Sequence, residues 1–415
     1  MATRKTPSDT PATETKPAAR SRKAAPAKVA KAAAAKPAAK AAAKPGAPRA
    51  KAKAAPAPTA TRAPRSRKPA IVDNLEHLAE PAIAAMSKAL DVLPVPVATA
   101  GRVVKAINKT RDANRLSRRV RNKIIVVTGA AAGIGEDCAI KLAKAGATVI
   151  LAARTPEKLD ATMAKIKAQG GKAFAYSCDI AEMADCDRFV NLVLEKHGHV
   201  DILINNAGRS IRRSLQYSFD RFHDFERTMQ LNYFGALRLI MGFSPAMLER
   251  RSGHIVNISS IGVLTHPPRF SAYVASKAAL DAFSACAASE YSDRNVHFTT
   301  IYMPLVKTAM TAPTKIYNAF PMLTPDEAAA MVMEAIIERP TRIATGLGLA
   351  GAVSHALTPK VSEYILNQAY HLFPDSARAR GLTDEEAARE AEALPKGKLE
   401  LARKLFVQVF QGVHW

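Results

Sequence analysis

Residues 123–135 read Lys-Ile-Ile-Val-Val-Thr-Gly-Ala-Ala-Ala-Gly-Ile-Gly and carry the strongest signal for the fold. The β-branched run from Ile124 to Thr128 is typical of a strand buried on both faces of a parallel sheet. Glycines follow at once, and a helical pattern then covers 136–144. Glycines let the backbone approach a pyrophosphate, and a helix N-terminus offers it free N–H groups. Strand, glycine turn and helix therefore predict a dinucleotide-binding unit.

Strands and helices alternate along the chain after this unit. We expect further strands at 148–153, 172–177, 201–204, 254–259, 297–302 and 342–345, with helices between them such as 156–169 and 181–197. This alternation predicts an α/β fold with a doubly wound parallel sheet, the Rossmann fold, over residues 122–345. Ligands of such sheets bind at the carboxyl ends of the strands.

Residues 1–70 have a different composition. They carry 18 basic and 2 acidic side chains, which is +16 of the chain's net charge of +24, and they lack Phe, Tyr, Trp, Leu and Ile. So little apolar surface does not offset chain entropy, and we expect a disordered basic arm. The arm would attract polyanions, nucleic acid or anionic lipid by counterion release. A non-specific tail is the alternative; a transit peptide is disfavoured because prolines are dense.

Two helical segments flank the predicted domain. Residues 71–121 form an amphipathic and then basic linker, for which packing on the catalytic domain or a second subunit is favoured over lying on anionic lipid. Residues 346–415 show apolar side chains at helical spacing and should form a helical extension that caps a pocket or joins subunits. We therefore expect a homo-oligomer.

The cysteines and the hydropathy pattern bear on location. Cys138, Cys178, Cys186 and Cys286 form no Cys-x-x-Cys pair, and no secretory segment precedes them, so a reducing, cytoplasmic setting is expected. No run reaches 18 apolar residues, which predicts no membrane span. Peripheral contact with a membrane or lipid inclusion stays open. No metal site is predicted.

Tyr273 and Lys277 are four residues apart, so on a helix they share one face. An ammonium beside a phenol should lower the pKa of the phenol and make it a usable proton donor to a carbonyl oxygen. Ser260 could donate a second hydrogen bond to that oxygen. The same Tyr-x-x-x-Lys spacing also arises by chance on surface helices.

Several motifs together resemble the short-chain dehydrogenase/reductase family in order and spacing. They are Thr128-Gly129-x-x-x-Gly133-Ile-Gly135, Asn205-Asn206-Ala207-Gly208, Asn232, Ser260, Tyr273 and Lys277.

The resemblance implies a role for each polar residue of this set. Tyr273 would be the general acid, Lys277 would bind the nicotinamide ribose and tune Tyr273, Ser260 would polarise the carbonyl, and Asn232 would hold a water of the proton relay. Ser259 competes with Ser260, which is preferred because its thirteen-residue separation from Tyr273 is the family's spacing.

Arg154 bears on the choice of cofactor. A carboxylate after the second strand would select NAD, but Ala153 stands there and Arg154 follows, whose guanidinium can pair with a 2′-phosphate. NADPH is therefore predicted, with a solvated Arg154 as the alternative. The resemblance implies cofactor contacts at Gly129, Ala131, Ala132, Gly133, Ile134, Gly135, Arg154, Asp179, Ile180, Asn206, Ala207, Gly208, Tyr273, Lys277, Pro304, Val306 and Thr308.

Longer stretches are similar to the bacterial fatty acyl-CoA reductases of this family. They are residues 209–213, 219–235, 303–306, 312–317 and 414–415. This similarity implies NADPH-dependent reduction of long-chain acyl-CoA to fatty aldehyde with release of CoA. The alternatives are a reductase of another ketone or aldehyde, 3-oxoacyl or steroid-like, and a protein that anchors to polyanions or lipid granules through its arm.

Expected substrate contacts follow from the same reading. Arg212 and Arg213 could meet the CoA phosphates. They could equally be solvated or pair with Asp220, Asp224 and Glu226. Met310 could cover the acyl chain, and residues 265–270 could frame the thioester, which Ser260 would polarise.

Overall fold

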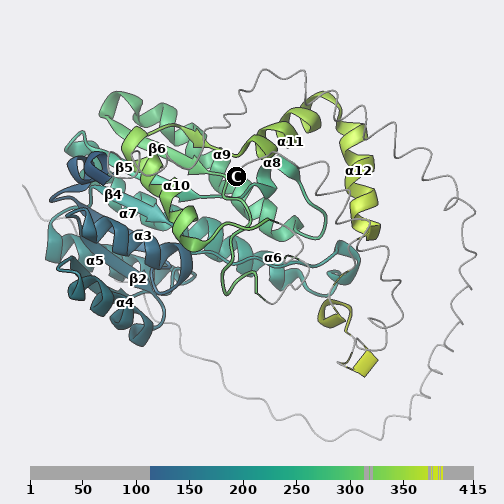
Figure 1. Ribbon diagram of the computed structural model, residues 1–415, viewed down its shortest axis with the longest axis horizontal. Helices are drawn as coiled ribbons and strands as arrows, with labels where there is room; N and C mark the ends of the chain where they lie inside the picture. The colour runs from purple at the N-terminus through teal and green to yellow at the C-terminus, as the bar shows by residue number, and fades with distance from the viewer. Residues whose placement is uncertain are drawn as a thin grey trace, which may run out of the picture. The chain divides into compact units, whose positions relative to one another are not determined.

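A seven-stranded parallel sheet in the order β3-β2-β1-β4-β5-β6-β7 forms the centre of the computed structural model (Figure 1). Its strands are β1 Ile124–Thr128, β2 Thr148–Ala153, β3 Lys172–Ser177, β4 Ile202–Asn205, β5 Gly253–Ile258, β6 Val296–Ile301 and β7 Arg342–Ile343. The chain runs outward from β1 to β3 and then crosses to β4 on the other side of β1. This reversal is the switch point where doubly wound sheets bind ligands. The predicted fold is confirmed.

The structure describes residues 113–312 and 321–372, together with 317, 375, 377–381, 383, 385 and 386. The predictions for the arm, for residues 71–112 and for residues 387–415 lie outside the described residues.

Helices cover both faces of the sheet because the strand side chains alternate between two apolar cores. Ile125 and Val127 of β1 belong to one core, whereas Val126 belongs to the other. The first core packs against α3 Gly133–Lys144, α4 Pro156–Ala168 and α10 Pro325–Glu338. The second packs against α5 Met183–His197, α7 Ala236–Glu249 and α9 Ser271–Tyr291.

The end of the linker belongs to this domain. Residues 113–120 are helical, and Leu116 and Val120 are buried in the first core. Arg119 donates a hydrogen bond from Nε to the Ile336 carbonyl at the end of α10 (3.3 Å). The folded domain therefore begins before residue 122, the predicted boundary.

Within the described residues, β7 is followed by α11 Gly346–Leu357 and α12 Pro359–Leu372, with a short 3-10 helix, η6 Ala377–Arg380, beyond them (Figure 1). Helix α11 lies close to α8 Gly262–Thr265, and a Cβ on Gly351 would come within 2.8 Å of the Thr265 side chain. The first helix of the C-terminal extension, α11, therefore packs against α8, which follows β5. Among the described helices, none is both long and apolar enough for a membrane span.

Helix α6 Phe222–Met229 continues into α7 through η3 Gln230–Gly235, a π-helical turn. No sequence pattern predicted this turn. Inserted π turns are frequent at functional sites, and Asn232 lies in this one.

Candidate active site

The glycine turn after β1 is shaped for close approach of a ligand. Gly129 and Gly133 have φ values of +66° and +58°, which glycine adopts without strain. A Cβ on Gly135 would lie 2.3 Å from the Gly129 carbonyl oxygen, so the position has no room for a side chain. The N-cap residue of α3 is Ala132, which has no capping side chain, so the first N–H groups of the helix can serve an anion.

Thr128 joins this turn to the neighbouring strand. Its hydroxyl oxygen accepts hydrogen bonds from the backbone N–H groups of Asn206 and Ala207, both at 2.9 Å, and it donates to the Ile204 carbonyl at 3.2 Å. The Asn206 amide donates to the Thr128 carbonyl at 2.9 Å. Thr128 was not among the predicted site residues. Its place in the sequence, a polar residue between an apolar strand and a glycine turn, could have identified it.

The side chains of Ser260 and Tyr273 lie beside each other, and the Ser260 hydroxyl is close enough to the phenol to lower its pKa. Ser260 lies two residues beyond β5, and Tyr273 lies in the first turn of α9. The Lys277 ammonium, one turn further along α9, is buried and donates to the Ile258 carbonyl at 2.7 Å. The Ser259 hydroxyl is buried and finds no hydrogen-bond partner within the described part of the chain. The structure therefore brings Ser260, and not Ser259, to the phenol.

Burial shifts the pKa values of both Tyr273 and Lys277. Burial raises the pKa of Tyr273, and the hydrogen bond with Ser260 offsets part of the rise. Burial also lowers the pKa of Lys277 to about 8. Burial and Ser260 are the causes of the shift at Tyr273, while the Lys277 ammonium is bonded to a carbonyl of β5. The tuning of Tyr273 by Lys277 stays a prediction.

Asn232 is locked in place from both ends of its side chain. Its amide donates to the Arg209 carbonyl and to the Ser276 hydroxyl, both at 2.9 Å, and its oxygen accepts from the Arg209 N–H at 2.8 Å. A Cβ on Gly208 would lie 3.2 Å from the Asn232 oxygen and 3.4 Å from the Lys277 nitrogen. The π turn thereby places Asn232, Gly208 and Lys277 around one point.

Arg154 and Asp179 lie at the other end of the predicted cofactor site. Their charged groups are 4.0 Å apart, and the Arg154 side chain is 64% exposed, so it can turn toward an anion. Ile180 is buried, and its carbonyl would lie 2.2 Å from a Cβ on Gly235.

The segment after β6 reaches the glycine turn. The Thr308 methyl lies 3.4 Å from the point that a Cβ on Gly133 would occupy. Pro304 and Val306 are buried, and Val306 forms a parallel bridge with Leu323. Predicted cofactor residues that are far apart in the sequence therefore meet at this turn.

The predicted substrate residues behave differently from one another. Arg213 forms an ion pair with Asp224 at 3.3 Å and donates to the Ala379 carbonyl at 3.0 Å, which is the alternative carboxylate pairing. Its contact with CoA phosphates stays a prediction. Arg212 is half-buried, and burial lowers its pKa. Met310 is 50% exposed.

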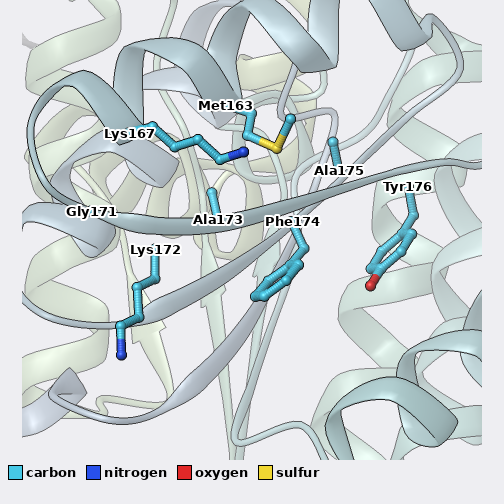
Figure 2. Close-up of a pocket in the computed structure, with 8 residues that line it drawn as sticks. All are labelled: Met163, Lys167, Gly171, Lys172, Ala173, Phe174, Ala175 and Tyr176. Carbon is cyan, nitrogen blue, oxygen red and sulfur yellow. The ribbon is translucent and has the colours of Figure 1, made fainter.

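A depression of about 430 Å³ lies elsewhere, along the edge strand β3. Figure 2 shows Met163 and Lys167 reaching in from α4, with Phe174 and Tyr176 extending from the strand. None of the predicted site residues lines it. Within the described residues, no three His, Cys, Asp or Glu side chains gather as metal ligands would.

A glycine turn for a dinucleotide, next to a Ser–Tyr–Lys proton-transfer site, defines an oxidoreductase of the α/β class. Residues 123–317 match the family model described as short chain dehydrogenase. The chain is 49% identical over 296 residues to a fatty acyl-CoA reductase of Acinetobacter baylyi, covering 71% of this chain and 96% of that protein. The chain therefore belongs to the short-chain dehydrogenase/reductase family, and the predicted family is confirmed.

Two further comparisons agree with this assignment. A fatty acyl-CoA reductase of Mycobacterium tuberculosis is 46% identical over 239 residues, covering 57% of this chain and 81% of that protein. Among solved structures, a short-chain dehydrogenase from Streptomyces avermitilis aligns with a TM-score of 0.52 at 29% identity, covering 60% of this chain and 97% of that one.

Proposed function

We propose that this protein reduces long-chain fatty acyl-CoA to fatty aldehyde and free CoA, with NADPH as the reductant. The observation that carries the proposal is the 49% identity to a fatty acyl-CoA reductase over nearly all of that protein's length. The neighbouring Ser260 and Tyr273 side chains supply the matching chemistry, because reduction of any carbonyl needs a proton donor at its oxygen.

The residues of the glycine turn fit a dinucleotide. The uncapped N-terminus of α3 would hold the pyrophosphate, and the missing Cβ of Gly135 leaves the backbone free to approach it. Arg154, exposed beside Asp179, would pair with the 2′-phosphate that distinguishes NADPH from NADH. When bound, NADPH supplies the hydride that the carbonyl carbon receives.

The side chains around Tyr273 would handle the oxygen and the proton. Ser260 would hydrogen-bond the thioester oxygen as negative charge develops there, and Tyr273 would transfer its proton to it. Lys277, buried one turn away, would hold positive charge close to the phenol as it loses that proton. Collapse of the resulting thiohemiacetal breaks its C–S bond and yields aldehyde and CoA, so no cysteine nucleophile is needed.

The first prediction tests this reaction. Purified protein given palmitoyl-CoA and NADPH should oxidise NADPH and release free CoA in equal amounts, with CoA quantified by chromatography. Tyr273→Phe should lower turnover at least about a hundredfold while NADPH still binds, because only the proton donor is lost. NADPH oxidation without release of CoA would contradict the thioester assignment and favour a ketone or aldehyde substrate.

A further inference from the structure

A buried ion pair links the C-terminal segment to the loop in front of the Tyr273 helix. The Arg269 Nε lies 2.9 Å from the Asp375 carboxylate, and the two side chains are only 5% and 2% exposed. Arg269 also donates to the Tyr370 carbonyl at 2.9 Å, and its guanidinium lies 4.0 Å from the centre of the Tyr370 ring. One arginine therefore binds the C-terminal segment in three ways.

The same carboxylate reaches a third part of the chain. The second oxygen of Asp375 accepts a hydrogen bond from the Ser214 N–H at 2.9 Å. Arg213 donates its own N–H to the Arg269 carbonyl at 2.8 Å. We call this set of five residues the clasp: Arg213, Ser214, Arg269, Tyr370 and Asp375. It joins the loop after β4, the loop before α9, the last turn of α12 and the segment after α12.

Arg269 of the clasp lies four residues before Tyr273 in the sequence. Arg269 has a backbone φ of +75°, which is unfavourable for any residue other than glycine. Such a conformation persists only when the surrounding structure holds it. Phe270 follows, and its ring meets the Tyr273 ring edge-on, with centroids 6.4 Å apart. The Phe270 carbonyl accepts from the Val274 N–H at 2.7 Å, in the first turn of α9. The position of the phenol therefore depends on the loop that the clasp holds.

A contribution to stability does not by itself explain why an ion pair is buried at Arg269 and Asp375. Removing two charges from water costs about as much as their attraction returns, so apolar residues of the same volume often serve equally well. What an ion pair with additional hydrogen bonds provides is a defined geometry. Packing beside it is tight, since the cavity next to Arg213, Asp224 and Arg269 measures only about 10 Å³.

We propose that Arg269 and Asp375 are positioning residues, through which the C-terminal extension holds the loop before α9 and thereby sets the Tyr273 phenol against the substrate carbonyl. The inference rests on the proposed function only in taking Tyr273 as the proton donor. It does not depend on which carbonyl compound is reduced.

The test compares kcat, NADPH affinity and melting temperature of Asp375→Asn and Arg269→Lys with those of the unchanged protein. Both variants should lower kcat about 10- to 100-fold, as small displacements of a catalytic group do, without a change in NADPH affinity. Asp187→Asn is the matched control. It breaks the Arg238–Asp187 pair, whose side chains are 45% and 44% exposed, and it should leave kcat unchanged.

A second set of measurements separates positioning from stability. The double variant Arg269→Gln with Asp375→Asn leaves no unpaired buried charge, so it stays folded where a single variant fails. It should lose no more activity than either single variant, because the two residues act as a unit. The alkaline limb that Tyr273 contributes to the kcat profile, which reports the protein with substrate and NADPH bound and not the free protein, should also move to lower pH. The reason is that a released phenol is less buried and its raised pKa falls toward the ordinary value.

The substrate is whichever carbonyl compound the unchanged protein reduces, palmitoyl-CoA or a free aldehyde, so failure of the acyl-CoA proposal does not affect this test. A kcat and a pH profile equal to those of the unchanged protein, in folded variants with a lowered melting temperature, would overturn the positioning role.

Discussion

Lys277 and Tyr273 show how burial sets the chemistry of single residues. Desolvation disfavours the charged form of each group, so the pKa of the lysine is lowered to about 8 and that of the tyrosine is raised. The lysine is the group whose charge changes close to neutral pH. The sequence showed the spacing of the two residues, but not that both would be buried.

A pH dependence follows from Lys277. Its folded pKa lies below the ordinary value of 10.5, so the folded protein loses this charge as the pH rises through about 8. The value of kcat/KM for NADPH reports the free protein and should therefore fall above about pH 8. In the Lys277→Arg variant the side chain at this position keeps its charge, so kcat/KM should not fall above about pH 8, even if the variant turns over slowly. A profile that stays level to high pH would contradict the role of the ammonium.

The same shift predicts a change in stability. Between about pH 8 and 10.5 the unfolded chain holds the Lys277 proton and the folded protein does not. This group therefore makes the free energy of unfolding rise with pH across that window.

At the scale of elements, the strand β1, its glycine turn and α3 act as one unit. Their bounds were predictable because β-branched runs and glycines are local signals, although α3 begins at Gly133 and not at residue 136. The π turn at 230–235 was not predictable, because its backbone shift depends on what Asn232 bonds to: the Arg209 backbone and Ser276.

Gly135→Ala tests this unit. The new Cβ would lie 2.3 Å from the Gly129 carbonyl and 2.6 Å from the Asn206 amide, so the turn must shift. We expect a loss of about 1–3 kcal/mol in the free energy of unfolding, measured with urea, and weaker NADPH binding. Gly346→Ala is the control, since a Cβ there has no atom within 4 Å and should leave NADPH binding unchanged.

At the scale of the whole molecule, charge and catalysis are separated along the chain. Residues 1–70 hold +16 of the net charge of +24, so the catalytic domain is not the main source of basicity. Contact with nucleic acid or anionic lipid through this arm stays a prediction, as does the homo-oligomer.

Deleting residues 1–70 tests the arm. The full chain should bind DNA or anionic vesicles with an affinity that falls steeply between about 50 and 200 mM salt, and the shortened chain should not. Palmitoyl-CoA reduction by the shortened chain serves as the control for an intact catalytic domain. Binding that survives the deletion would show that another surface is responsible.

Sequence alone was enough to predict the fold and the family, and it singled out Ser260, Tyr273 and Lys277 as candidate catalytic residues. Alternating apolar runs, glycine turns and motif spacings are local properties of the chain, so they can be read without coordinates. Only the tertiary structure decided that Arg213 pairs with Asp224, that burial governs both pKa values, and that Arg269 meets Asp375 across 106 positions. Partners and desolvation arise when distant segments pack together, and no local pattern encodes them.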